Sequence, residues 1–296
     1  MREKFTDRSF SDDSMKLIRW ADGELSGLQQ QGYRVSLRQL YYIGVTQNLY
    51  PNTTAAYKNL GKLISEARLA GWIDWDAIED RGRRPVETQF WESPLDIMVK
   101  ATEMFKINKW LDQPVHVEVM VEKSALEGIM IPVCREFEVP FHANKGYSSS
   151  SALYELGKSL QERAVVGRKR VVIIYAGDHD PSGCAMSQDV LERLQLFSQS
   201  QITVMRVALN MPQIERYNPP PQFSKESDTR TPAYIARYGT DKCYELDALP
   251  PRALAGIVRA AIKHHIDPDK WAKSEARELE MKDQLQTIVD SLTPEP

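Results

Sequence analysis

Residues 170–183 read RVVIIYAGDHDPSG, and this stretch decides the fold class. It begins as an apolar run of the β-branched and aromatic residues that strands favour. The run ends in Asp178, and the following Asp180 and Pro181 are well placed to cap and open a helix. A strand that leads directly into a helix is typical of a parallel α/β sheet, in which sites lie at the carboxyl ends of the strands.

The same alternation of strand and helix extends on both sides of this stretch. Strands are expected at residues 115–122, 139–144, 170–177 and 201–209, with helices between them at 124–137, 151–165 and 182–197. This order predicts a parallel sheet with right-handed crossovers. The Pro-rich residues 210–232 should then form a long connection, before a short strand (242–246) and helices at 252–265 and 270–291.

The first third of the chain has a helical pattern. Helices are expected at residues 14–30, 36–46 and 55–70, with a capping box of Ser36 and Gln39 opening the second. An aromatic stretch (72–75) and a basic one (81–84) follow. Three helices before a β-like, basic extension is the order of a winged helix-turn-helix domain.

Three parts of the chain follow from these patterns. Residues 1–85 would form the winged-helix domain, and residues 86–113 a single helix that links it to the rest. Residues 114–296 would hold the α/β domain with a helical extension at its end. The fold class is therefore α/β, with a small helical domain in front of a larger domain built on a parallel sheet.

Acidic residues end two of the predicted strands. Glu122 closes the strand at 115–122, and Asp178 and Asp180 follow the strand at 170–177. Three carboxylates at one sheet edge can hold one or two hard divalent cations and leave room for phosphate oxygens. Each acid also has a structural interpretation, because Asp178 can belong to a turn and Asp180 can cap a helix. Taken together, they favour a metal site.

Composition restricts where nucleic acid could bind. The formal net charge is −3 at pH 7, so a nucleic-acid surface would need basic residues gathered locally. The third helix and the basic stretch supply such candidates, although a solvated helix face explains them equally well. The candidates are Lys58, Lys62, Arg68, Arg81, Arg83 and Arg84.

The cellular compartment is indicated by the cysteine spacing and by the lack of targeting or membrane-spanning patterns in the sequence. The three cysteines are widely spaced and form neither a zinc pattern nor a disulfide set, which favours a reducing compartment. The amino-terminal residues resemble no signal peptide, and no apolar run is long enough to cross a bilayer. We therefore expect a soluble, cytoplasmic protein without membrane association.

A Glu at the end of one strand and an Asp-x-Asp after a later one resemble the Toprim domain of topoisomerases, primases and some nucleases. The resemblance covers roughly residues 114–210. It implies that Glu122, Asp178 and Asp180 bind Mg²⁺. The form Asp-x-Asp-Pro-x-Gly is most similar to the branch that contains the topoisomerase VI A subunit and the meiotic break-forming proteins.

A tyrosine pair lies within the second predicted helix. Aromatic pairs at such positions are usually core, but helix neighbours point about 100° apart, so one can pack while the other faces outward. Arg38 lies on the same face as Tyr42, where a guanidinium would favour the phenolate. The pattern Ser-x-Arg-x-Leu-Tyr-Tyr is similar to the nucleophile motif of the same branch. The resemblance implies that Tyr42 attacks DNA, assisted by Arg38, with Tyr41 as its packed neighbour.

The resemblance implies a specific activity. This is Mg²⁺-dependent cleavage of double-stranded DNA by tyrosine transesterification, of the type IIB topoisomerase and double-strand-break-forming class, with a 5′-phosphotyrosyl link. It implies a homodimer in which the tyrosine of one protomer faces the metal of the other. The chain resembles a compact, stand-alone A subunit, so any ATPase would be a separate B-type subunit. Two alternatives remain open: a Toprim nuclease that uses metal-activated water, and a non-catalytic DNA-binding module.

Overall fold

The computed structural model describes residues 2–78, 88, 90–143, 150–223 and 228–292. The chain divides into two compact units. The first unit combines Met1–Asp80 with Val117–His264, and the second combines Arg81–His116 with His265–Pro296. No helix among the described residues is long and apolar enough to cross a membrane.

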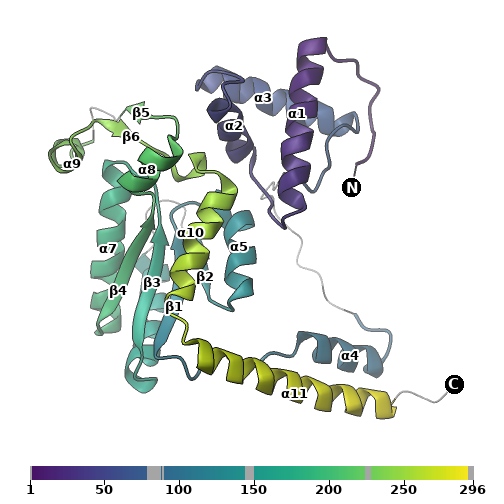
Figure 1. The fold of residues 1–296 in the computed structure, drawn as a ribbon, viewed down its shortest axis with the longest axis vertical. Coiled ribbons are helices and arrows are strands. Elements are labelled where there is room, and N and C mark those ends of the chain that lie inside the picture. Colours follow the sequence, from purple (N-terminus) through teal and green to yellow (C-terminus); the bar gives the residue numbers. More distant parts are fainter. Residues whose placement is uncertain (1, 79–87, 89, 144–149, 224–227, 293–296) are drawn as a thin grey trace. The chain divides into compact units, whose positions relative to one another are not determined.

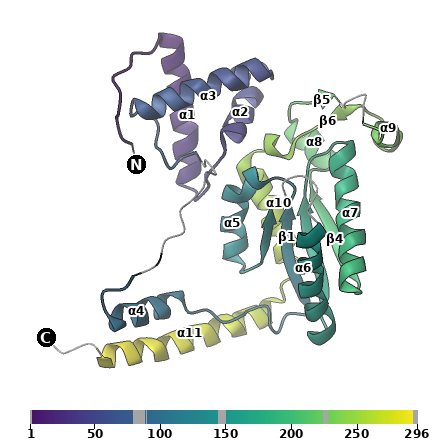
Figure 2. The ribbon, with the colours of Figure 1, turned by 180° about the vertical axis from the view of Figure 1, so that it is seen from behind.

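A four-stranded parallel sheet forms the centre of the first unit (Figure 1). Its strand order is β2-β1-β3-β4, which confirms the predicted α/β class and parallel sheet. Helices cover both faces: α6 and α7 lie on one, and α5 and α10 on the other (Figures 1 and 2). The strands are Val115–Val121 (β1), Phe141–Ala143 (β2), Arg170–Ala176 (β3) and Ile202–Ala208 (β4). The helices between them are Ser124–Leu126 (η1), Glu127–Glu136 (α5), Ser150–Gln161 (α6), Glu162–Val166 (η2) and Pro181–Ser198 (α7).

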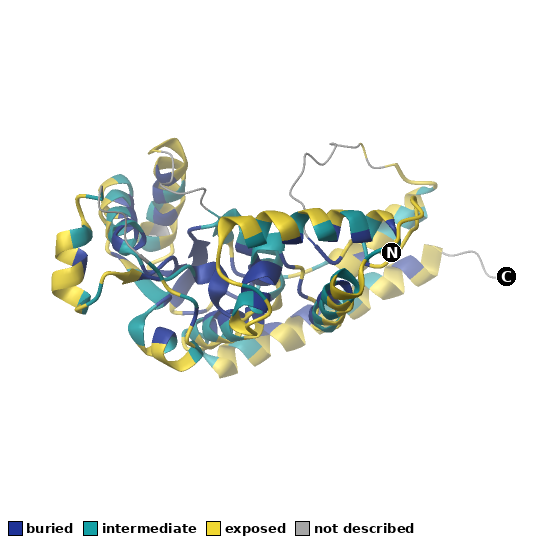
Figure 3. Cartoon of the chain, turned by 90° about the horizontal axis from the view of Figure 1, so that it is seen from above, coloured by how far each residue is buried: buried dark blue, intermediate teal, exposed yellow. Residues whose placement is uncertain are grey.

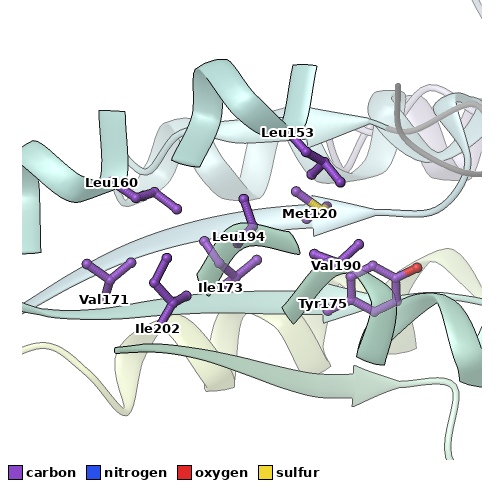
Figure 4. Packing of buried hydrophobic residues seen from close by; sticks show 9 residues of the cluster. All are labelled: Met120, Leu153, Leu160, Val171, Ile173, Tyr175, Val190, Leu194 and Ile202. Atoms are coloured by element: carbon purple, nitrogen blue, oxygen red, sulfur yellow. The ribbon is translucent and has the colours of Figure 1, made fainter. Parts of the chain in front are cut away.

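An apolar cluster of buried residues lies between the sheet and helices α6 and α7 (Figure 4). Alternate residues of β3 point into it, because successive side chains of a strand face opposite sides of a sheet. Strands β1 and β3 are almost wholly buried, whereas β2 and most of β4 are only partly buried. Figure 3 shows exposed residues on the outer faces of the helices. The cluster comprises Met120, Leu153, Leu160, Val171, Ile173, Tyr175, Val190, Leu194 and Ile202.

The amino-terminal region is helical, as the sequence predicts. Its helices are Asp12–Gln29 (α1), Leu37–Thr46 (α2) and Thr54–Leu69 (α3). The predicted capping box is present: Ser36 accepts from the Gln39 amide nitrogen, and the Gln39 side chain accepts from that of Ser36. The predicted β-like extension is not formed in residues 72–78, which hold turns and one isolated bridge, Val35↔Ile78.

The segment after β4 is more ordered than its proline content suggests. The described residues of the long connection predicted at 210–232 contain a helix, Met211–Tyr217 (α8), and the short strand Gln222–Phe223 (β5), and a second helix, Thr231–Tyr238 (α9), begins at its end. Asn210 and Gln213 form a capping box that opens α8. β5 pairs antiparallel with Lys242–Cys243 (β6), and Leu246–Ala248 (η3) and Pro251–Lys263 (α10) complete the unit.

The second unit consists mainly of two helices, Pro94–Met104 (α4) and Pro268–Leu292 (α11), which pack against each other. The single helix predicted over 86–113 is therefore wrong in extent. Ser93 caps α4 at its start, with Pro94 at the first helical position, and the backbone becomes extended at Phe105. Lys109 pairs with Glu278 at 3.0 Å inside this unit, and Trp110 contacts the Trp271 ring edge-on.

Candidate functional site

The carboxyl ends of β1 and β3 bring two of the predicted acids together. Glu122 follows β1, and its amide nitrogen donates to the Ala176 carbonyl of β3 at 3.0 Å. Its Oε2 atom accepts from the Asp178 amide nitrogen at 2.8 Å. Both side chains are buried. Glu122 therefore has a structural role in holding the Asp178 loop, which the sequence does not indicate.

Two glycines permit this close approach. A Cβ on Gly177 would lie 2.6 Å from Glu122 Oε2, and a Cβ on Gly183 would overlap the Asp178 carbonyl oxygen. Neither position can accept a side chain without moving the acids or their loop.

Asp180 acts as a helix cap. Its Oδ1 accepts from the Gly183 amide nitrogen at 2.6 Å at the start of α7. His179, between the two aspartates, turns away from them, and its Nδ1 lies 2.7 Å from the Tyr234 hydroxyl. Burial lowers the pKa of His179 to about 4, so its ring is neutral at physiological pH. Asp180 thus adds a negative charge to the site and also caps helix α7.

Lys123 pairs with Asp178 and also contacts two carboxylates, Glu245 and Asp247, that are not among the predicted site residues. Its Nζ lies 2.7 Å from Asp178 Oδ2, 3.0 Å from Glu245 Oε2 and 3.9 Å from Asp247 Oδ2. Burial alone would lower the pKa of Lys123, but the carboxylates outweigh it and raise that pKa. Burial likewise tends to raise the pKa of Glu245, yet Lys123 and Arg38 lower it overall. The cluster is therefore a buried network of charges rather than a row of exposed acids.

Helix α2 joins the same cluster. Arg38 Nη2 donates to both carboxylate oxygens of Glu245, and its Nε lies 3.4 Å from Asp247 Oδ2. Arg38 Nη2 also lies 3.4 Å from the Tyr42 hydroxyl, as expected from residues one helical turn apart. The Gln222 amide donates to the Tyr42 hydroxyl at 2.9 Å and to Glu245 Oε1 at 3.0 Å. Tyr42 is thus connected to the acid site of its own chain.

The outward orientation expected of Tyr42 is wrong, because both members of the tyrosine pair are buried. Tyr41 packs among Tyr50 and Tyr57, and its hydroxyl lies 3.1 Å from Asn52 Oδ1. The two hydroxyls differ in their partners: that of Tyr41 meets uncharged oxygens of residues 51–53, whereas that of Tyr42 meets Arg38 and Gln222 beside the charged cluster.

Arg206 on β4 shapes the loop that carries Asp178. Its guanidinium donates to the carbonyl oxygens of Gly177 at 3.0 Å, Asp178 at 2.5 Å and Gly183 at 2.9 Å. These bonds tie the Asp178 loop to the start of α7, and the Gly177 carbonyl oxygen also accepts from the Leu209 amide nitrogen at 2.8 Å. Arg206 is therefore a structural support of the site and was not foreseen from the sequence.

The predicted basic residues fall into three groups. Lys58 and Lys62 are exposed on α3. Arg68 is engaged within the fold, where it donates to the Trp75 carbonyl at 2.6 Å and lies over the Trp75 ring. The remaining three, Arg81, Arg83 and Arg84, lie outside the described residues.

Carboxylates are the type of ligand that a hard divalent cation prefers, but the three predicted acids do not surround a common metal position. Among the described residues, no group of three or more His, Cys, Asp or Glu side chains is arranged to hold a metal ion. Burial, followed by the charge of Asp178, raises the pKa of Glu122 to about 7. That repulsion is what a bound cation would relieve, and Mg²⁺ commonly uses one or two carboxylates together with phosphate oxygens. Glu122 and Asp178 fit this smaller set.

Two of the residues that were missed share one signal. Glu245 lies at the end of the short strand predicted at 242–246 and Asp247 directly follows it, as Glu122 ends and Asp178 follows a longer predicted strand. The strand-end rule applied to residues 242–246 would have brought them into the candidate set. Gln222 carries no comparable signal, because it lies after three prolines in a stretch expected to be irregular.

Comparisons with models of protein families, with curated proteins and with solved structures found no match for this chain.

Proposed function

We propose that this chain cleaves double-stranded DNA by tyrosine transesterification, in the class of type IIB topoisomerases and double-strand-break-forming enzymes. In this proposal, α1–α3 belong to a winged-helix DNA-binding domain, and the parallel sheet with its helices is a Toprim domain. Two copies would cut the two strands. Strand passage, if it follows cleavage, would require a separate ATPase subunit.

One observation carries the proposal: a continuous polar path links Tyr42 to Asp178 within one chain. Gln222 bridges Tyr42 and Glu245, and Lys123 bridges Glu245 and Asp178. The neighbouring Tyr41 hydroxyl meets only uncharged acceptors, the carbonyl oxygens of Pro51 and Thr53 and Oδ1 of Asn52. Tyr42 instead meets a guanidinium and an amide beside a charged cluster, an environment suited to chemistry at its oxygen.

In the proposed step, the Tyr42 oxygen attacks a backbone phosphorus and the bond to the 3′ oxygen breaks. The phenol loses its proton, the departing 3′ oxygen gains one, and Tyr42 becomes joined to the 5′ phosphate. Burial and next Glu245 raise the pKa of Tyr42 to about 12, whereas Arg38 lowers it. The phenolate therefore needs a nearby cation, and Arg38 is placed to supply that charge.

Glu122 and Asp178 would hold Mg²⁺, with Asp180 contributing its charge from the start of α7. Bound there, Mg²⁺ would neutralise charge on the attacked phosphate. The two acids also keep the Asp178 loop in place, so their structural and chemical roles coincide. Asp178 is fixed from two sides, since its Oδ1 accepts from the Leu246 amide nitrogen at 2.8 Å.

The test is adduct formation on supercoiled DNA with Mg²⁺, comparing Tyr42→Phe with wild type. Covalent protein–DNA adducts should form with wild type and be lost in Tyr42→Phe. Tyr41→Phe is the matched control, because it removes a buried phenol from the adjacent position and should retain adducts. Adducts that persist in Tyr42→Phe would show that another group is the nucleophile.

A Toprim nuclease is the second candidate, and the burial of Tyr42 favours it. In that mechanism, a metal-activated water cuts the strand and Tyr42 only packs. It predicts free 5′ phosphates, no adduct, and full cleavage by Tyr42→Phe. A non-catalytic DNA-binding module would instead bind DNA without cutting it, and Glu122→Ala would change only the stability of the fold.

A further inference from the structure

We propose that Arg38, Lys123 and Gln222 form a binding site for a backbone phosphate of DNA, and that the Glu245 carboxylate fills this site in the absence of DNA. The inference rests on the proposed function for the identity of the ligand. It adds two binding residues, Lys123 and Gln222, and a competing group inside the same chain.

The donors around Glu245 are those that bind phosphates in proteins. Arg38 donates from one nitrogen to both carboxylate oxygens, Lys123 lies 3.0 Å from Oε2, and Gln222 donates to Oε1 at 3.0 Å. A guanidinium, an ammonium and an amide converge from three different elements on one carboxylate. Guanidinium and ammonium groups recognise a phosphate by the same charge-assisted hydrogen bonds.

The Glu245 carboxylate lies next to the Tyr42 hydroxyl. Gln222 donates to both groups, and Arg38 contacts both. A cavity of about 260 Å³ opens at this point, lined by Tyr42, Glu245 and the start of α3 among others. An anion in place of Glu245 would therefore lie beside the tyrosine and could be reached from the cavity.

Replacing the Glu245 carboxylate by a DNA phosphate leaves the net charge of the cluster unchanged. Arg38 and Lys123 face three carboxylates, those of Asp178, Glu245 and Asp247. A phosphodiester carries one negative charge, as Glu245 does, so replacing one by the other leaves the balance unchanged. The two remaining carboxylates keep the cations in place: Asp247 is fully buried, while the Glu245 side chain is 17% exposed and is the one free to move outward.

Glu245 must then compete with DNA, so removing it should strengthen binding. We would measure the affinity for a short fluorescein-labelled duplex by anisotropy in EDTA, where no cleavage occurs. Glu245→Ala should bind about 10-fold more tightly than wild type, which corresponds to ~1.4 kcal/mol. The matched control is Glu136→Ala, which removes an equal charge from an exposed pair with Arg259 and should change affinity by less than about 2-fold.

Two further variants keep the inference testable if Glu245→Ala folds poorly. Glu245→Gln retains the shape of the side chain and should also bind DNA more tightly than the control. Gln222→Ala should weaken binding about 3-fold to 10-fold by removing one donor. Affinities of the Glu245 variants equal to that of Glu136→Ala, or a neutral Gln222→Ala, would overturn the phosphate site.

These outcomes are separate from those of the proposed chemistry. Tighter binding by Glu245→Ala without covalent adducts in wild type would retain the phosphate site and reject transesterification. Adducts in wild type without tighter binding by Glu245→Ala would do the reverse.

Discussion

The buried Asp247 carboxylate should lower the stability of the fold at neutral pH, and we predict that Asp247→Asn raises it. The side chain is fully buried, and within the described part of the chain neither carboxylate oxygen has a hydrogen-bond partner. Burial raises the pKa of Asp247 to about 6 from an ordinary 3.8; Lys123 and Arg38 oppose the shift, and Asp178 and Glu245 add to it. The ionised form is therefore disfavoured in the folded state.

The sign and size follow from the two pKa values. Between pH 3.8 and about 6 the folded state binds the Asp247 proton more tightly than the unfolded state, so stability falls as pH rises through this window. A difference of about two pKa units, at ~1.4 kcal/mol per unit, corresponds to ~3 kcal/mol above pH 6. Asparagine cannot ionise and should avoid most of this cost, so we expect a gain of ~1–3 kcal/mol at neutral pH.

Urea denaturation in EDTA would measure the effect at about pH 8 and again near pH 4. The gain from Asp247→Asn should be largest at the higher pH and shrink toward the lower one. Asp283→Asn, at an exposed position of α11, is the control and should show little change at either pH. A loss of stability in Asp247→Asn at pH 8 would refute the reasoning, and so would a gain that does not depend on pH.

Three further substitutions test other parts of the molecule. Gly183→Ala would drive a Cβ into the Asp178 carbonyl oxygen and should cost ~1–3 kcal/mol; an unchanged urea midpoint would contradict this. Lys62→Gln should reduce the salt dependence of DNA binding by about one unit of slope if α3 contacts a phosphate, and an equal slope would remove α3 from the interface. Lys109→Met breaks a pair with Glu278 and should destabilise the second unit by ~1.5–3 kcal/mol, measured by its thermal unfolding; no change would show that the pair contributes nothing.

Local sequence signals predicted the elements that local physics determines. The capping box of Ser36 and Gln39 sets the start of α2, and it involves only residues within one helical turn. The apolar runs of β1 and β3 could be recognised because burial on both faces leaves few polar residues. Such signals need no knowledge of the rest of the chain.

Two predictions failed in segments where capping residues indicated a helix start but the overall residue pattern was given more weight. Residues 210–232 are rich in proline, yet Asn210 and Gln213 carry a capping box that opens α8. Residues 86–113 have apolar residues at helical spacing, yet Ser93 and Pro94 mark a later start. In both cases the capping residues were in the sequence and would have corrected the expectation.

The composition of the candidate site was harder to predict than its location. Arg38 and Glu245 are separated by 207 positions, and nothing in either segment indicates the other. Glu122 and Asp178 could be placed at one sheet edge because strand topology determines where strand ends meet. The partners of Tyr42 instead depend on how α2 packs against η3, which periodicity does not reveal.

Whether each catalytic centre is built from one chain or two can be tested by mixing inactive variants. The resemblance implies that Tyr42 acts on the acids of a partner, but Gln222, Glu245 and Lys123 connect it to Asp178 of its own chain. We therefore predict that each centre lies within one chain. Equal amounts of Tyr42→Phe and Asp178→Asn, unfolded and refolded together, should then form no adducts.

The two arrangements differ in the number of complete catalytic centres that a mixed dimer contains. In a mixed dimer with centres inside each chain, one lacks the nucleophile and the other lacks a metal ligand, so neither can react. With centres shared between chains, the intact Tyr42 of the Asp178→Asn chain would meet the intact acids of its partner. Adducts confined to the Asp178→Asn chain would therefore contradict the prediction. They would require α2 to leave the Glu245 cluster when the dimer forms, and the contacts seen within one chain would then be a resting arrangement.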